Sequence, residues 1–240
     1  MHSDKRTMID SILFMRAPAA WACLLAVFLS GCNPPKYATY TSVRGDWRAS
    51  VPWGWNVMTD QEGAHYSNTT FIGPFEPEFY LGVPSLSVRW YGYSLPRRLP
   101  DGLLEMYASA EDYYAQVLKN VYGPEPLLRR PLHEVEVAGR RAKHFVVLSP
   151  LRVPKGALWG TALDADTGRL VNLREHAYVL LPLKRGFYVL IYPATRDGFK
   201  LYEPQFNQLV NSFAPLQEGP GGPKPEAPAA ASSPREAFGS

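Results

Sequence analysis

Apolar and polar residues alternate with a period of two along much of the chain, which predicts β-strands. Residues 85–93 show this pattern as a half-buried strand, and residues 133–137 and 140–148 repeat it around an Ala-Gly turn that favours a hairpin. Residues 186–192 are an unbroken apolar run with β-branched and aromatic members, which is typical of a central strand. We therefore expect a mainly antiparallel sheet.

Turn-forming residues mark further strands and one irregular segment. Residues 46–52 and 55–59 flank a Pro-Trp-Gly turn and are predicted to be short strands. Residues 156–164 and 169–180 flank a loop rich in Asp and Gly, which favours a second hairpin. Glycine and prolines interrupt residues 71–79, so a loop is expected there.

Two segments repeat apolar residues at helical spacing. The first starts at Asp101, a candidate N-cap, and stops at a Gly-Pro pair, residues 123–124. The second runs over residues 203–212 with Pro204 in its first turn, where the missing N–H does no harm. Each helix should pack one apolar face on the sheet. The apolar positions are Leu103, Leu104, Tyr107, Tyr114, Leu118 and Val121 for the first helix, and Phe199, Tyr202, Phe206, Leu209, Val210 and Phe213 for the second and the residues before it.

The N-terminus has the order of a secretory signal peptide. Basic residues precede an apolar run over residues 17–29, which ends in small residues. The run is shorter than the roughly 20 residues that a transmembrane helix needs. We therefore expect residues 1–31 to be removed by cleavage after Gly31.

The cleavage region reads Leu-Ser-Gly-Cys over residues 29–32 and resembles the lipobox of bacterial lipoproteins. This resemblance implies that lipid is attached to Cys32, which becomes the first residue of the mature protein. Several acyl chains would hold the product on the membrane of the cell envelope, facing the periplasm. Asn33, rather than Asp, follows the cysteine, which in a Gram-negative cell favours the outer membrane over the inner.

Composition divides the rest of the chain into three parts. Residues 32–44 contain the lipidated cysteine and a polar tether, and residues 45–216 have the length of one domain. Residues 217–240 are mostly Gly, Pro, Ala, Ser and charged residues, and they contain too little apolar surface to fold. We expect this last segment to be a disordered tail.

Charge and cysteine content exclude several classes of function. Loss of residues 1–31 removes three basic and two acidic residues, so the net charge falls from +3 to +2. Such a small charge argues against nucleic acid as a partner. Cys23 lies in the signal peptide and Cys32 is consumed by lipid, so the mature chain has no cysteine for a disulfide, a metal site or thiol catalysis.

The order of five motifs resembles the PsbP/Mog1-type domain. The motifs are an opening P-x-G-W turn (residues 50–55), a V-x-G-x-x-A hairpin (137–142), a closing apolar strand (187–192) and two parts of a final helix (202–206 and 209–213). The resemblance implies an α+β fold, an α-β-α sandwich around a mainly antiparallel sheet. Known members of the family act mainly as binding or assembly proteins and share no single active site, and fold likeness transfers no ligand.

Catalytic motifs are missing from the sequence. It contains no Gly-rich phosphate loop, no H-E-x-x-H and no G-x-S-x-G. The histidines His65, His133, His144 and His176 form no close pair in sequence, so we expect no metal and no cofactor. His133 and His144 sit in one predicted hairpin but could face opposite sides of it. An acid-base group around Glu175 and His176, with Asp164 and Asp166, is a weaker interpretation than a polar strand edge. We expect the protein not to be an enzyme.

Three hypotheses for the function remain. The first is a membrane-anchored, non-catalytic module that binds or supports an envelope protein partner. The alternative is a periplasmic small-ligand carrier, and the third is a metal-dependent hydrolase. Aromatic side chains exposed in a cleft can stack on partners or ligands. The candidate contact residues are Trp53, Trp55, Phe75, Phe79 and Tyr80.

Overall fold

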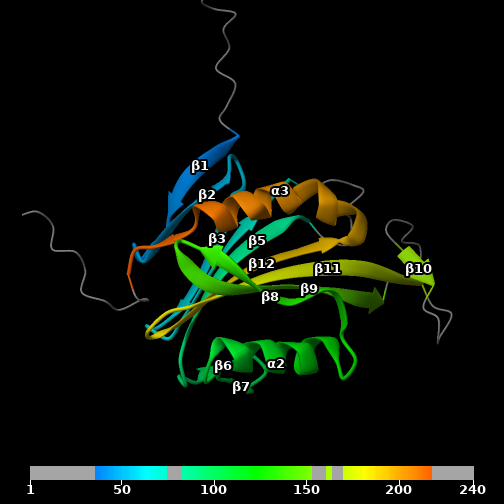
Figure 1. Cartoon of the computed structure of the whole chain (residues 1–240), viewed down its shortest axis with the longest axis horizontal. Helices are drawn as coiled ribbons and strands as arrows, with labels where there is room; N and C mark the ends of the chain where they lie inside the picture. The colour runs from blue at the N-terminus through cyan, green and yellow to red at the C-terminus, as the bar shows by residue number, and fades with distance from the viewer. Residues whose placement is uncertain (1–35, 75–82, 153–160, 164–169, 218–240) are drawn as a thin grey trace, which may run out of the picture. The chain divides into compact units, whose positions relative to one another are not determined.

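The computed structural model describes residues 36–74, 83–152, 161–163 and 170–217. Its main sheet has the strand order β3-β4-β5-β12-β11-β9-β8, with β10 paired to β11, and every pairing is antiparallel (Figure 1). The expected mainly antiparallel sheet is therefore confirmed. The strands are β3 (Asn56–Glu62), β4 (Tyr66–Ile72), β5 (Ser85–Gly92), β8 (Leu127–Val137), β9 (Arg140–Arg152), β10 (Thr161–Leu163), β11 (Leu170–Pro182) and β12 (Gly186–Thr195).

The middle of the sheet is buried on both faces. β12 lies between β5 and β11, which confirms the central strand that the apolar run predicted. β5 was expected to be half-buried, but Ser87 and Tyr91 on its second face are also buried. This prediction was wrong because a helical layer covers each face of the sheet, and alternation along one strand carries no information about that cover.

The β8–β9 hairpin has the turn that its sequence predicted. Val137 pairs with Arg140, which leaves Ala138 and Gly139 as a two-residue loop. Both have positive φ, 53° and 71°, as a type I′ turn requires. β10 pairs with β11 as expected for the second hairpin, whereas the loop between them lies outside the described residues.

Helix α3 (Arg196–Ser212) covers one face of the sheet (Figure 1). Thr195 caps it, because its Oγ1 accepts a hydrogen bond from the Gly198 N–H at 3.2 Å. The helix therefore starts seven residues earlier than predicted, and Pro204 lies inside it. Phe199 and Tyr202 are buried in the turns before the proline, which offsets the lost backbone hydrogen bond.

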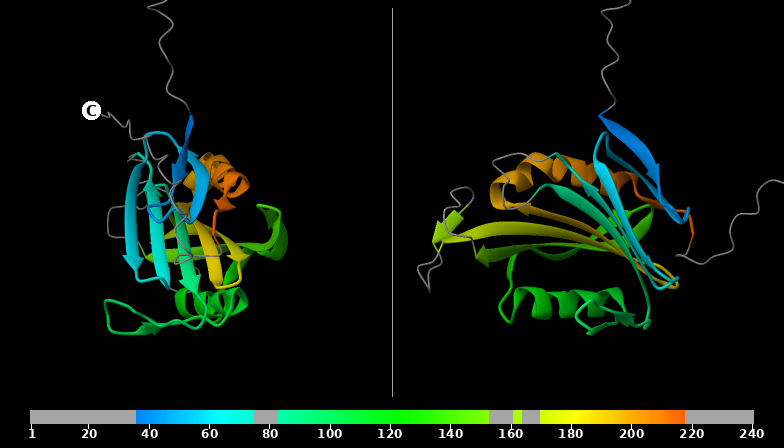
Figure 2. Two further views of the ribbon diagram at one scale, coloured as in Figure 1. Left: turned by 90° about the vertical axis from the view of Figure 1, so that its left-hand side faces the viewer. Right: turned by 180° about the vertical axis from the view of Figure 1, so that it is seen from behind.

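Helix α2 (Ala110–Tyr122) covers the opposite face (Figure 2). Its N-cap is Ser109, not the predicted Asp101, which instead accepts a hydrogen bond from the Leu103 N–H at 3.0 Å in a turn. The preceding segment contains two short paired strands, β6 (Arg97–Arg98) and β7 (Leu104–Glu105). The predicted helix start was wrong. Leu103 and Leu104, two apolar residues that were expected on its buried face, are exposed and precede the helix.

A second, three-stranded sheet has the order β1-β2-β13 and combines both ends of the described chain. Its strands are β1 (Tyr37–Thr41), β2 (Trp47–Pro52) and β13 (Ala214–Pro215). Residues 37–41 were assigned to a polar tether ending at residue 44, so that segment is shorter than predicted. Phe71, expected in a loop, is fully buried in β4. Residues 37–41 form a strand because they pair with β2, and Phe71 belongs to a strand because β4 pairs with β5. The residues within each segment do not reveal these pairings.

The arrangement is an α+β fold with an α-β-α order of layers, as expected. One hydrophobic cluster lies between α3 and the sheet, and a second lies between the sheet and α2. Within the described ranges, no helix combines the length and the apolar character needed to span a membrane.

Candidate functional site

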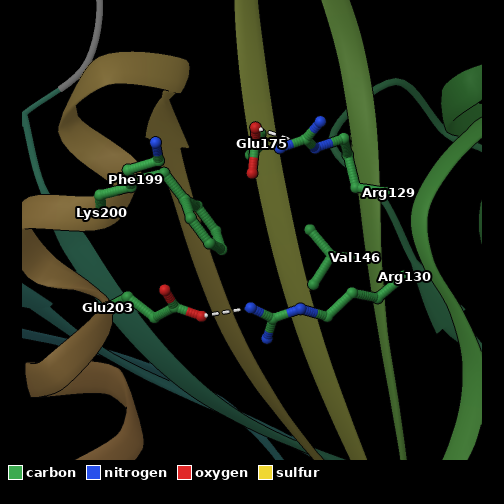
Figure 3. Close-up of a pocket in the computed structure, with 7 residues that line it drawn as sticks. All are labelled: Arg129, Arg130, Val146, Glu175, Phe199, Lys200 and Glu203. Atoms are coloured by element: carbon green, nitrogen blue, oxygen red, sulfur yellow. Dashed lines mark hydrogen bonds and ion pairs between the residues drawn. The ribbon is translucent and has the colours of Figure 1, made fainter.

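A bulge in β8 directs the side chains of two neighbouring arginines, Arg129 and Arg130, into one pocket. In a regular strand, Arg129 and Arg130 would point to opposite faces of the sheet. The register between β8 and β9 shifts between Leu128 and Arg130 and again between Arg130 and His133. Both arginine side chains consequently reach the same pocket (Figure 3). Bulges are often found where a functional side chain has to be redirected.

The pocket lies between α3 and strands β8, β9 and β11, and we call it the α3–β8 pocket. Its volume is about 120 Å³. Val146 and Phe199 provide apolar surface, and the charged side chains lie around them (Figure 3). Its lining residues are Arg129, Arg130, Val146, Glu175, Phe199, Lys200 and Glu203.

Two ion pairs cross the α3–β8 pocket. Arg129 Nε lies 3.3 Å from Glu175 Oε1, and Arg130 Nη2 lies 3.0 Å from Glu203 Oε1. The Glu175 side chain is 8% exposed, whereas the Arg129 side chain is 49% exposed. A carboxylate this buried needs a charged partner, and here the partner comes from the open side of the pocket. With Lys200 exposed on α3, the lining contains three basic and two acidic residues.

Both carboxylates of the α3–β8 pocket are engaged in ion pairs. Each carboxylate is held by an arginine, and the third basic side chain of the lining, Lys200, is exposed. Sites for small molecules usually have volumes of roughly 300–1,000 Å³. The α3–β8 pocket, at about 120 Å³, is smaller and has the size of a side chain or carboxylate group.

The aromatic contact residues predicted from the sequence lie elsewhere. Trp53 is 57% exposed, and Trp55 packs edge-on against Tyr202 at 5.8 Å between ring centroids. Neither lines the α3–β8 pocket. Phe75, Phe79 and Tyr80 lie outside the described residues. Arg129 and Arg130 are not among the predicted contact residues, because the bulge that brings them together has no sequence signature.

Glu175 and His176 do not form a shared acid-base group. They are neighbours on β11, so their side chains point to opposite faces of the sheet. Glu175 lines the α3–β8 pocket, whereas His176 hydrogen-bonds the Tyr122 hydroxyl on the α2 side. Asp164 and Asp166 lie outside the described residues. Among the residues that are described, no group of three or more His, Cys, Asp or Glu could hold a metal ion.

A buried network surrounds His176. The Tyr122 hydroxyl also hydrogen-bonds the Tyr178 hydroxyl at 2.6 Å, and Arg174 Nε lies 3.4 Å from His176 Nε2. Burial, and secondly the Arg174 charge, lower the pKa of His176 to about 4 from its ordinary 6.5. The imidazole is therefore neutral at pH 7 in the folded protein.

This shift predicts a loss of stability in mild acid. The unfolded chain takes up a proton on His176 below about pH 6.5, whereas the folded protein does so only near pH 4. The free energy of unfolding should therefore fall between pH 7 and 4.5, with about 2 kcal/mol of the loss due to this residue. Urea unfolding of the wild type and of His176→Gln at both pH values measures this. Equal pH dependence in the two proteins would show that His176 contributes nothing.

No known family model and no curated protein sequence matches this chain. Among solved structures, the solution structure of cyanobacterial PsbP from Synechocystis sp. PCC 6803 shares 15% identity and a TM-score of 0.46, over 77% of this chain and 95% of that one. LpqN of Mycobacterium tuberculosis, involved in cell envelope biogenesis, shares 14% identity and a TM-score of 0.40, over 74% and 89%. A Pseudomonas aeruginosa protein of unknown function shares 15% identity and a TM-score of 0.38, over 76% and 99%. With TM-scores below 0.5, these likenesses assign no ligand or partner to this chain.

Proposed function

We propose that this protein is a membrane-anchored, non-catalytic module of the cell envelope that binds a protein partner through the α3–β8 pocket. The lipobox supports the envelope location, and the redirected pair Arg129 and Arg130 is the observation that carries the binding role. The bulge exposes both guanidinium groups on the same side of the sheet, next to apolar surface.

The charges of the α3–β8 pocket favour a partner that supplies a carboxylate. Arg129 uses Nε and Arg130 uses Nη2 for their internal ion pairs, and both side chains are about half exposed. A guanidinium has five N–H donors, so each arginine keeps further donors for an external anion. Lys200 adds a positive charge on the α3 side. An acidic segment of an envelope protein fits this chemistry.

A small-ligand carrier is the second candidate function, and the α3–β8 pocket does not favour it. Carriers enclose most of the ligand surface in a largely apolar cavity. Here the cavity is small and five of its seven lining residues are charged.

Site-specific photocrosslinking tests the proposal. A photoreactive amino acid at position 200, at the exposed α3 edge of the α3–β8 pocket, should crosslink a protein partner in native membranes, while the same group at position 141, on the exposed part of β9, should not. In a purified pair, Arg130→Glu should weaken binding at least about tenfold, because it places like charge against the acidic partner. Arg141→Glu is the matched control. Equal crosslinking at both positions, or equal affinity of both variants, would refute the α3–β8 pocket as the binding site.

A further inference from the structure

Two histidines on consecutive strands lie next to each other across the β8–β9 hairpin. His133 and His144 are direct partners in the strand register. His133 Nε2 lies 3.3 Å from His144 Nδ1, and the ring centroids are 4.9 Å apart. Both strands place alternate residues on each face, and Val135 and Ala142 show that this is the α3 side of the sheet.

A backbone carbonyl orients the first imidazole. His133 Nδ1 lies 3.0 Å from the Pro131 carbonyl oxygen. A carbonyl oxygen can only accept, so Nδ1 carries the proton and donates it. In the neutral ring this leaves the lone pair of Nε2 directed towards His144. Histidines that ligate metals are typically held in this way, with the far ring nitrogen donating to a carbonyl or carboxylate.

The separation of the two nitrogens matches a shared metal ion. Zinc–nitrogen bonds are about 2.0–2.1 Å, and a tetrahedral angle between two of them puts the nitrogens roughly 3.3–3.4 Å apart. The observed separation is 3.3 Å. The same distance also fits a hydrogen bond from the His144 N–H to His133 Nε2, which holds the two imidazoles together in the metal-free protein.

We propose that His133 Nε2 and His144 Nδ1 bind one divalent transition metal ion of the zinc, nickel or copper type. Imidazole is a common ligand for all three metals. To bind, His144 shifts its ring proton to Nε2, which exposes the Nδ1 lone pair without a change of net charge. The remaining coordination positions are open to water or to a ligand from outside, since no third His, Cys, Asp or Glu joins this pair within the described residues.

Calorimetric titration of the purified protein with Zn²⁺ alone is the first test. The full-length protein should bind one equivalent at this site, and His133→Ala and His144→Ala should each weaken that binding at least about tenfold. His65→Ala is the matched control and should bind as the wild type does. Because His133 is exposed, its replacement should leave thermal unfolding nearly unchanged.

Cu²⁺ supplies a readout that does not depend on affinity. Electron paramagnetic resonance of the one-equivalent complex should show two imidazole nitrogens in the wild type and one in each variant. Zinc affinity that is the same in wild type and both variants, absence of stoichiometric binding, or an unchanged nitrogen count would each overturn the proposal.

Discussion

Cys32→Ser is expected to release the protein from membranes and to block its normal maturation. The lipobox interpretation makes this thiol the point of lipid attachment, and serine cannot replace a thiolate in that reaction. Each buried methylene contributes about 0.8 kcal/mol to anchoring, so loss of two or three acyl chains removes nearly all membrane affinity.

Membrane fractionation after a salt wash measures this effect. The chain offers a matched control in Cys23, which lies in the apolar part of the signal peptide. Cys23→Ser should leave the protein in the membrane fraction. A Cys32→Ser protein that has lost residues 1–31 and still sediments with washed membranes would contradict lipid anchoring at this residue.

Gly186→Ala is expected to be the most destabilising small substitution in the sheet. Gly186 starts β12 directly opposite Gly92 of β5. A Cβ at this position would overlap the Tyr91 carbonyl oxygen and would lie 2.6 Å from Cζ2 of the buried Trp90 ring. The first obstacle is backbone, so rotation of a side chain cannot remove it. Separation of two central strands should cost at least about 3 kcal/mol of unfolding free energy.

Urea unfolding of purified Gly186→Ala tests this expectation. Arg185→Ala is the matched control, because Arg185 is an exposed side chain in the same turn. It should change the free energy of unfolding by less than about 0.5 kcal/mol. If Gly186→Ala is as stable as the control, β5 and β12 do not approach each other as closely as the structure indicates.

Strands and turns were predictable wherever the signal is local. The Ala-Gly pair predicted the β8–β9 hairpin because positive φ at both positions is a property of those two residues. The apolar run predicted central strand β12 because consecutive apolar side chains point to both faces of a strand, so both faces have to be buried. Both helix starts were predicted wrongly. Leu103 has the spacing of a residue on a buried helix face but is exposed, and Pro204 is typical of a first helical turn but lies inside α3.

The candidate site could not be predicted from the sequence. Arg129 and Arg130 reach the same pocket because of a register shift against β9, which depends on how the two strands pack. Glu175 meets Arg129 because β11, β9 and β8 are neighbours in the sheet. The pairing of His133 with His144 is an exception, because it follows from the two-residue Ala-Gly turn that the sequence predicted.

By itself, the sequence determined most of the antiparallel strands, and it contains none of the catalytic motifs named above. It also predicts the secretory and lipidation signals. Those features are read from neighbouring residues, so they need no knowledge of distant contacts. Tertiary structure decided which faces of the strands are covered, where β1 joins the domain and which charged residues share the α3–β8 pocket. These depend on pairing between segments far apart in the chain, whose free energy comes from burial and packing that no local pattern records.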